Sequence, residues 1–255
     1  TKIYSVAGKL QQRSGLIIRR PFRSPHHTIS YTALVGGGSY PMPGEISLAH
    51  NGVLFLDELP EFSRKTIEVL RQPLEDRTVQ ISRAKMNVSY PSSFMFVASM
   101  NPCPCGYYGA AGHSCYCKPN QILQYRNKIS GPLYDRIDLQ VQVSAITYEE
   151  ISDMGISGES SEVIRSRVIA ARCMQHKRFA GTEIHSNSQM DCNELRKHCI
   201  LPQKGRLLMK KTMEHYMLSG RAHDRILKVA RTVADLDGSE QISEAHLSEA
   251  IRYRM

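Results

Sequence analysis

The sequence predicts an α/β domain followed by a smaller helical domain. Residues 1–145 mix short apolar runs with loops rich in Gly and Pro, whereas residues 161–255 carry almost only helical patterns. The stretch DMGISGESS (153–161) is typical of a linker, which we place at residues 146–160. Strands mixed with helices and followed by a separate helical part are typical of an α/β core with a helical lid.

The composition narrows the class of protein. A chain of 255 residues with 41% hydrophobic and 22% charged residues fits a globular protein of one or two domains. Its apolar runs are shorter than the ~18 residues of a membrane span, and no signal peptide is apparent. The net charge of +9 favours a polyanionic partner such as nucleic acid. Seven cysteines, an odd number, without a secretory signal indicate a reducing, cytoplasmic compartment.

The first chemical signal is the segment NGVLFLDELPEF. Val53 to Leu56 are apolar throughout, as in a central parallel strand that is covered on both faces. Asp57 and Glu58 then fall at the carboxyl end of this strand, where open α/β sheets place their ligands. There an aspartate can hold Mg²⁺ and a glutamate can activate water, although a solvated acidic turn would show the same pattern. Residues 63–76 follow as a predicted helix, capped by Ser63 and kinked at Pro73.

Two further strand signals follow. RTVQIS and MNVSYP flank RAK (83–85), which predicts a β-hairpin with a basic tip. Arg77, Arg83 and Lys85 could contact DNA phosphates, unless the tip is simply solvated. FMFVASMN (94–101) predicts a second buried strand, ending at Asn101. That side chain could hold an attacking water beside the first strand's carboxylates, or it could merely start an Asn-Pro turn.

The segment CPCGYYGAAGHSCYC contains two C-x-C pairs, Cys103 with Cys105 and Cys115 with Cys117. Four thiolates can close a tetrahedral cage around a structural Zn²⁺, with His113 as a possible substitute ligand. Free thiols and two disulfides are the alternatives, and a reducing compartment disfavours the disulfides. The remaining cysteines, Cys173, Cys192 and Cys199, have no such pairing and are expected to be ordinary core or surface thiols. The pair His26-His27 is expected to be loop structure.

Four segments together resemble a known family: PFRSPHHTISYTALVGGGSYPMPGEISLAHNGVLFLDELPEFSRKTIEVLRQPLED, ASMNPCPCGYYG, SGPLYDRIDL and SGRAHDRILKVARTVADL. They resemble the magnesium-chelatase-like AAA+ ATPases of the ComM/YifB type over nearly the whole chain. The resemblance implies an incomplete AAA+ P-loop core, a parallel sheet with β-hairpin insertions, followed by a helical lid domain. It also implies ATP and Mg²⁺ as cofactors, a hexameric ring, and a DNA branch-migration helicase of natural transformation.

The resemblance also assigns roles to single residues. Asp57 and Glu58 match Walker B, Asn101 matches sensor 1, Arg136 matches the arginine finger, and Arg221 matches sensor 2. Arg136 precedes the alternating segment IDLQVQV, which predicts a strand, so its guanidinium could reach a neighbouring subunit's γ-phosphate. Arg221 follows Ser219, the predicted cap of a lid helix, where it could contact the bound nucleotide. A surface ion pair is the alternative for each arginine.

The phosphate loop is missing from the expected place. A P-loop requires G-x-x-x-x-G-K-[ST], but Gly8-Lys9 is followed by Leu10 and has Ile3 where the first glycine belongs. VGGGSY (35–40) contains no lysine. In the family the P-loop precedes TKIYSVAG, so we expect a carboxy-terminal fragment that is inactive alone. Two alternatives to a DNA motor stay open: the motor subunit of a metal chelatase, and a non-enzymatic, zinc-stabilised nucleic-acid-binding module.

Overall fold

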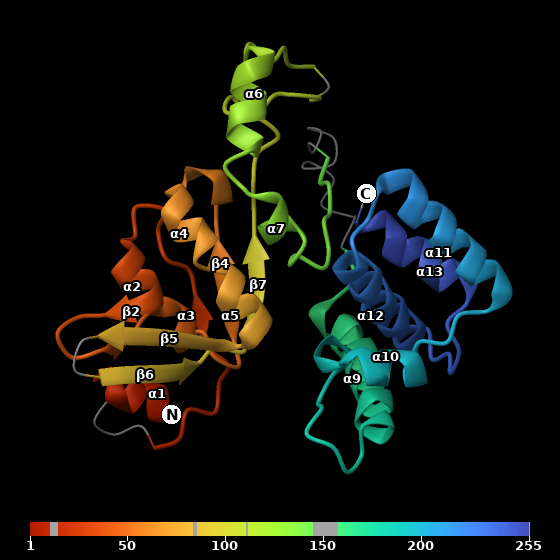
Figure 1. The fold of residues 1–255 in the computed structure, drawn as a ribbon, viewed down its shortest axis with the longest axis horizontal. Coiled ribbons are helices and arrows are strands. Elements are labelled where there is room, and N and C mark those ends of the chain that lie inside the picture. Colours follow the sequence, from red (N-terminus) through yellow and green to blue (C-terminus); the bar gives the residue numbers. More distant parts are fainter. Residues whose placement is uncertain (11–14, 84–85, 111, 145–157, 255) are drawn as a thin grey trace. The chain divides into compact units, whose positions relative to one another are not determined.

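The computed structural model describes residues 1–10, 15–83, 86–110, 112–144 and 158–254. The chain forms two compact units, Thr1–Ile137 and Asp138–Met255. The first is mixed α/β and the second is helical, which confirms the predicted fold class (Figure 1). Most of the predicted linker lies outside the described residues, which resume at Gly158.

A parallel three-stranded sheet is the frame of the first unit. Its strands are β1 (Phe22–Arg23), β4 (Val53–Leu56) and β7 (Met95–Ala98), in the order β1-β4-β7. The register pairs Phe22 with Val53 and Leu56 with Ala98. The predicted central strand is therefore confirmed as β4, and the carboxyl ends of β4 and β7 lie at one edge of the sheet (Figure 1).

The two faces of this sheet differ. Leu54 and Leu56 are fully buried, in a core shared with helices α2 (Tyr31–Val35), α3 (Glu45–Leu48) and α4 (Arg64–Glu68). Val53 and Phe55 point to the other face and are only half-buried. β7 is mostly exposed. The predictions that β4 is covered on both faces and that the second strand is buried are thus wrong for the described residues, because helices cover one face and β7 pairs only with β4.

Glycines shape the segment between the first helices. α1 (Lys2–Val6) is followed later by the two-stranded ribbon of β2 (Gly36–Gly37) and β3 (Met42–Pro43). A Cβ atom on Gly36 would lie 2.3 Å from the Met42 carbonyl oxygen, and one on Gly44 would lie 2.4 Å from the Leu34 carbonyl oxygen. The glycine-rich insertion is therefore a tight hairpin whose backbones touch.

The helix predicted over residues 63–76 is split in two. Ser63 caps α4 by accepting a hydrogen bond from the Thr66 N–H at 3.2 Å. A second helix, α5, spans Arg71–Asp76. Pro73 has no N–H to donate to the Val69 carbonyl, so the helical hydrogen bonding is interrupted at Val69 and Leu70, between α4 and α5.

The predicted basic hairpin is confirmed. β5 (Thr78–Arg83) pairs antiparallel with β6 (Met86–Pro91), and residues 84 and 85 lie outside the described residues. The 3₁₀ turn η1 (Leu59–Glu61) lies between β4 and α4, and two helices follow β7: α6 (Pro119–Arg126) and α7 (Gly131–Tyr134). The strand predicted over residues 137–143 is wrong, since this fully described segment pairs with no strand. An alternating apolar pattern is compatible with a strand, but a strand also needs a neighbouring strand for its backbone hydrogen bonds, and the pattern does not predict one.

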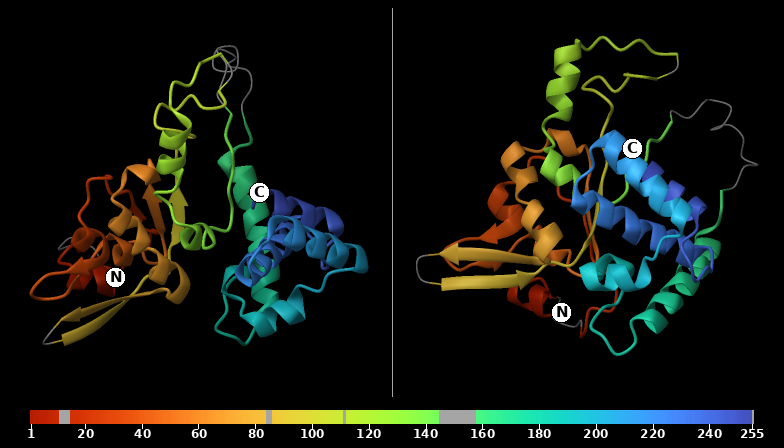
Figure 2. Two further views of the ribbon diagram at one scale, coloured as in Figure 1. Left: turned by 45° about the horizontal axis from the view of Figure 1, so that its top comes forward. Right: turned by 45° about the vertical axis from the view of Figure 1, so that its right-hand side comes forward.

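The second unit consists of five helices and a 3₁₀ turn within the described residues: α9 (Ser161–Arg178), η2 (Asn187–Gln189), α10 (Cys192–His198), α11 (Gln203–Tyr216), α12 (Gly220–Leu236) and α13 (Glu244–Arg252). Ser219 caps α12 and Ser243 caps α13, as their sequences predict. The helices of this unit pack side by side (Figure 2), and they enclose a separate apolar core. Among the described residues, no helix is both long and apolar enough to cross a membrane.

A buried ionic network crosses this core. The Asp235 carboxylate accepts hydrogen bonds from Arg178 at 2.5 and 2.7 Å, from the Asn187 amide at 2.7 Å and from Arg231 Nε at 3.1 Å. The Asp235 side chain is 0% exposed. A buried carboxylate with this many donors links α9, η2 and α12, and losing it would leave two guanidinium groups without their shared partner.

Candidate functional site

The predicted Walker B pair lies at the carboxyl edge of the sheet. Asp57 and Glu58 directly follow β4 and are exposed. Ser99 directly follows β7 and lies beside them. Its hydroxyl donates a hydrogen bond to Asp57 Oδ1 and accepts one from the Glu58 N–H at 3.1 Å. The same N–H lies 3.1 Å from Asp57 Oδ1, so one hydroxyl fixes both acidic residues relative to the next strand.

Glu58 has an unusual backbone conformation. Its φ of 51° and ψ of 53° lie in the left-handed region, which non-glycine residues rarely adopt. The Leu59 N–H donates to the Ser99 carbonyl at 2.9 Å, and the Ser99 N–H donates to the Leu56 carbonyl at 3.1 Å. These bonds continue the strand pairing past the turn and hold the strained residue in place. Strain of this kind is concentrated at functional sites.

Asn101 follows two residues after Ser99 and is exposed. Its backbone lies close enough to the hydroxyl of Tyr125, a buried side chain of α6, to lower the pKa of that hydroxyl. Burial raises the pKa of Tyr125, and the negative charges of Glu61 and Glu58 raise it further. Tyr125 therefore lies near both Asn101 and the acidic turn, and it connects them to α6.

The two predicted arginines occupy different surroundings. Arg136 follows α7, its side chain is 9% exposed, and it forms an ion pair with Glu75 of α5. It also donates to the Pro132 carbonyl at 2.8 Å. Arg221 lies in the first turn of α12 and is exposed. The structure thus places Arg136 in an intramolecular ion pair, and the finger and sensor 2 roles stay predictions.

Neither glycine segment considered as a phosphate loop has the order of strand, glycine loop and helix. Gly8 follows α1 rather than preceding it, and Lys9 lies 3.6 Å from Glu45. Gly36 and Gly37 form β2 of the ribbon. Neither of these two segments therefore forms the cradle of backbone amides that phosphates need, whereas Asp57 and Glu58 are carboxylates suited to Mg²⁺.

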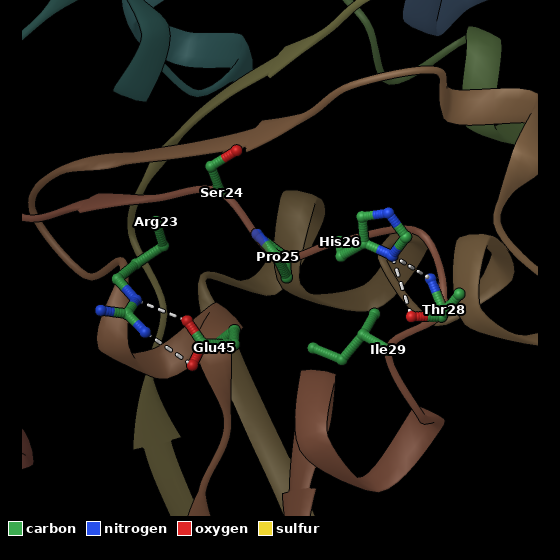
Figure 3. Close-up of a pocket in the computed structure, with 7 residues that line it drawn as sticks. All are labelled: Arg23, Ser24, Pro25, His26, Thr28, Ile29 and Glu45. Atoms are coloured by element: carbon green, nitrogen blue, oxygen red, sulfur yellow. Dashed lines mark hydrogen bonds and ion pairs between the residues drawn. The ribbon is translucent and has the colours of Figure 1, made fainter.

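A pocket of about 320 Å³ lies beside these segments (Figure 3). On one side Arg23 donates two hydrogen bonds to Glu45, at 2.5 and 2.7 Å. Burial alone would raise the pKa of Glu45, but Arg23 and Lys9 hold it below its usual value. On the other side His26 Nδ1 lies 2.9 Å from the Thr28 hydroxyl. The charged groups of this pocket are already paired, and His26 belongs to loop structure as its sequence predicts.

The predicted DNA contacts do not lie together. Arg77 is half-buried in the left-handed turn that ends α5, at the base of the β5–β6 hairpin. Arg83 ends β5 at the far end, and its side chain and Lys85 lie outside the described residues. Six strand residues at ~3.3 Å each separate the base from the tip. A nucleic acid could therefore contact Arg77 and the hairpin tip at the same time only if it extends along the hairpin.

The four predicted cysteines meet. The Sγ atoms of Cys103, Cys105, Cys115 and Cys117 all lie within 4.8 Å of one another. Cys103 Sγ lies 3.3 Å from Cys105 Sγ and 3.7 Å from Cys115 Sγ, which are 3.5 Å apart from each other. Zn–S bonds of ~2.3 Å in a tetrahedron place sulfurs ~3.8 Å apart, whereas a disulfide needs ~2.05 Å. All four thiols are free, so the arrangement suits a metal better than disulfides. His113 is not part of the cluster and stacks on Tyr107.

The thiols of this cluster resist joint ionisation. Burial opposes the ionisation of Cys105, yet hydrogen bonds from the Tyr107 backbone and the neighbouring thiols lower its pKa to about 6. Burial and the proximity of Cys105 raise the pKa of Cys117 to about 12. One thiolate forms easily and the next do not, because their charges repel. A divalent cation would remove this repulsion, so the cluster is a suitable metal site.

Ser99, Tyr125 and Glu75 are the functional-site residues that sequence reasoning missed. Ser99 could have been found, because pairing Leu56 with Ala98 sets Asp57 opposite Ser99. Glu75 could not, since no pattern links it to Arg136 along the chain. The structure thus joins Asp57, Glu58 and Ser99 directly and brings Asn101 near them through Tyr125.

Comparison with known proteins identifies the family. Residues 1–151 match the family of magnesium chelatase, subunit ChlI, and residues 158–254 match the C-terminal part of that subunit. YifB of Escherichia coli K12 is 48% identical over 236 residues, which cover 92% of this chain and 46% of YifB. The competence protein ComM of Haemophilus influenzae is 46% identical over 236 residues, covering 92% of this chain and 45% of ComM.

Rv2897c of Mycobacterium tuberculosis is 38% identical over 255 residues, covering 100% of this chain and 50% of that protein. The chain thus spans about half the length of the curated relatives it matches. Both units match the same family, and the strand that carries Asp57 and Glu58 lies within the first match. The chain therefore belongs to the magnesium-chelatase-like AAA+ family.

Proposed function

We propose that this chain is part of an ATP-driven AAA+ motor that remodels DNA, with the branch-migration helicase activity expected of ComM-type members. The observation that supports this most is the hydrogen-bonded set of Asp57, Glu58 and Ser99 at the carboxyl edge of the parallel sheet. This arrangement suits an acidic pair that binds a metal ion together with a phosphate ligand. The relationship to the competence protein ComM supports the choice of DNA.

Each residue of the site has a proposed role. Asp57 would hold Mg²⁺, whose bound charge would neutralise the phosphates of ATP. Glu58 would orient the attacking water and take its proton, and Asn101 would hold that water from the next strand. Arg221 would contact the nucleotide from the lid. The phosphate loop would lie outside this chain, so the chain alone should neither bind ATP tightly nor hydrolyse it.

Arg136 is proposed as the finger of a hexameric ring, supplied to the neighbouring subunit. Its ion pair with Glu75 supports a resting state in which the guanidinium is held until a neighbour's nucleotide competes for it. In the full-length protein, Arg136→Ala should abolish hydrolysis and spare ATP binding. Mixed rings with Glu58→Gln subunits should regain part of the activity, and mixed rings that stay inactive would show that the finger is another residue.

The remaining proposals concern nucleic acid, metal and compartment. Arg77, Arg83 and Lys85 would contact DNA phosphates along the β5–β6 hairpin without reading sequence. The four-cysteine cluster would hold a structural Zn²⁺ with no open coordination position. Free thiols throughout the chain suit a reducing cytoplasm.

The test is ATP turnover by the full-length protein, with and without DNA. Wild type should release phosphate, and DNA should stimulate the rate. Glu58→Gln should keep ATP binding and lose turnover, whereas Glu61→Gln, a nearby exposed acid outside the pair, should keep both. An absence of turnover in wild-type protein that binds ATP and DNA would refute the proposed activity.

A second candidate rests on the family description, magnesium chelatase subunit ChlI. In that case the same ATP machinery would drive a partner that inserts a metal into a porphyrin. Stimulation of the ATPase by such a partner and not by DNA would favour it. A non-enzymatic, zinc-stabilised nucleic-acid-binding module is the third candidate, and it requires DNA binding without any turnover in the full-length protein.

A further inference from the structure

One long part of the first unit contains no acidic residues. Between Asp76 and Asp135 the sequence contains no Asp or Glu. This acid-free segment includes the β5–β6 hairpin, β7, the cysteine cluster and α6. A long basic stretch without compensating carboxylates attracts polyanions. Its basic residues are Arg77, Arg83, Lys85, Lys118, Arg126 and Lys128.

The second half of this segment also exposes aromatic rings. The cysteine loop, residues 103–118, carries Tyr107, Tyr108 and Tyr116, which are 42%, 49% and 78% exposed. Three exposed tyrosines on one short loop are unusual, because large rings generally bury most of their apolar area. The sulfurs of the cluster, at the two ends of this loop, lie within 4.8 Å of one another. The three rings are therefore carried by a loop whose ends lie close together.

Basic side chains lie among these rings. The Arg126 guanidinium is 5.3 Å from the centre of the Tyr108 ring, and the same residue donates to the Pro102 carbonyl at 3.2 Å. Lys118 and Arg126 are exposed at the two ends of α6. Exposed rings next to exposed cations are the two components that bind unstacked bases and their phosphates.

We infer that the cysteine loop and α6 form a binding surface for single-stranded nucleic acid. Tyrosine rings stack on bases, and Lys118 and Arg126 contact the backbone phosphates. A single strand fits better than a duplex, because paired bases already stack on each other and offer only their edges. This inference rests on the proposed nucleic-acid partner but not on the proposed ATP chemistry.

The surface is separate from the hairpin contacts proposed above. In all three ribbon views, α6 and the cysteine loop lie beyond the end of the first unit toward which β4 and β7 point, away from the β5–β6 hairpin (Figures 1 and 2). Asp57 and Glu58 lie at that same sheet edge. Because the backbone of Asn101 lies near the hydroxyl of Tyr125 in α6, this surface is connected to Asn101 through one side chain.

The test is a fluorescence anisotropy titration of this chain with a labelled oligothymidylate and with a duplex of equal length, without nucleotide. The single strand should bind more tightly. Tyr116→Ala should weaken it about fivefold or more, and Tyr116→Phe, which keeps the ring, should bind like wild type. Lys118→Gln should lower the slope of log affinity against log salt by about 0.7. Tyr216→Ala removes an exposed tyrosine (52%, against 78% for Tyr116) from the second unit, at the end of α11, and should change nothing.

Unchanged thermal melting and metal content of each variant separate lost contacts from lost structure. Wild-type affinity in Tyr116→Ala, or no single-strand binding by the chain, overturns the inference whatever the ATPase result. Sedimentation gives a further outcome. If Tyr116→Ala abolishes self-association and leaves strand affinity intact, the surface binds a second copy of the chain and the inference is wrong.

Discussion

Replacing Ser99 by alanine removes one hydroxyl from the acidic edge of the sheet. That hydroxyl donates to Asp57 Oδ1 and accepts from the Glu58 N–H. The backbone bonds of Ser99 to Leu56 and Leu59 remain, so the pairing of β4 with β7 should persist. The substitution therefore tests positioning of the acidic pair rather than folding.

The expected size follows from these contacts. A hydrogen bond to a charged group contributes about 1.5–3 kcal/mol, and the exposure of Asp57 favours the lower end. About 1.4 kcal/mol corresponds to a factor of ten in rate. Glu58 also loses one of the bonds that hold its left-handed backbone, a conformation that costs about 1–3 kcal/mol. We therefore predict a drop in kcat of roughly tenfold or more.

The assay is steady-state phosphate release by the full-length protein. In Ser99→Ala, kcat should fall while KM for ATP changes little, since the hydroxyl contacts the acidic pair and not the nucleotide. Ser99→Thr keeps the hydroxyl and should recover most of the rate. Ser93→Ala removes a hydroxyl from the loop before β7 and is the matched control. A kcat within twofold of wild type in Ser99→Ala would refute the reasoning.

Three further perturbations have defined outcomes. Asp235→Asn should lower the unfolding free energy of the second unit, measured by thermal denaturation, by about 3 kcal/mol or more, because two buried guanidinium groups lose their counter-charge. The control is Asp237→Asn, at an exposed carboxylate, which should change this free energy by no more than about 0.5 kcal/mol. Cys115→Ser should reduce bound zinc below about one ion per chain in elemental analysis and lower the melting temperature, whereas Cys173→Ser, an exposed thiol outside the cluster, should do neither. Wild type prepared without chelators that contains no zinc would contradict this. Burial lowers the pKa of His50, so protonation is favoured in the unfolded chain; the stability it contributes is present above the unfolded pKa of about 6.5 and is lost as the pH falls below it. His50→Gln should therefore flatten the melting-temperature profile between about pH 7 and pH 5, and a profile parallel to wild type would contradict the assignment.

Local patterns predicted the elements whose cause is local. The apolar run Val53–Leu56 after an Asn-Gly turn gave a correct strand, and Ser63, Ser219 and Ser243 cap helices as expected. The burial of β7 was predicted wrongly, because it depends on which strands and helices lie beside it and not on its own residues. The alternation in residues 137–143 failed for the same reason.

The residues of the candidate site also divide into those that the local sequence predicts and those that depend on tertiary packing. Asp57, Glu58 and Asn101 could be proposed to share one sheet edge because each follows a predicted strand, and the spacing of the cysteines correctly predicted that four sulfurs meet. The pairing of Arg136 with Glu75 could not be predicted, since it joins α5 to the turn after α7 through tertiary packing. Ser99 was available from the register but carries no charge, so its role became apparent only from its hydrogen bonds.

The turn before β4 also governs how the protein ages chemically. An Asn-Gly pair deamidates when the glycine nitrogen attacks the asparagine side chain, which requires a free and mobile N–H. Here the Gly52 N–H donates to the Ala49 carbonyl at 2.8 Å, and a Cβ on Gly52 would lie 1.9 Å from the Pro21 carbonyl oxygen. The folded chain thus shields the reactive nitrogen, and the unfolded chain does not. Rearrangement at Asn51 would add a backbone carbon directly before β4, in the turn that leads into the central strand of the sheet.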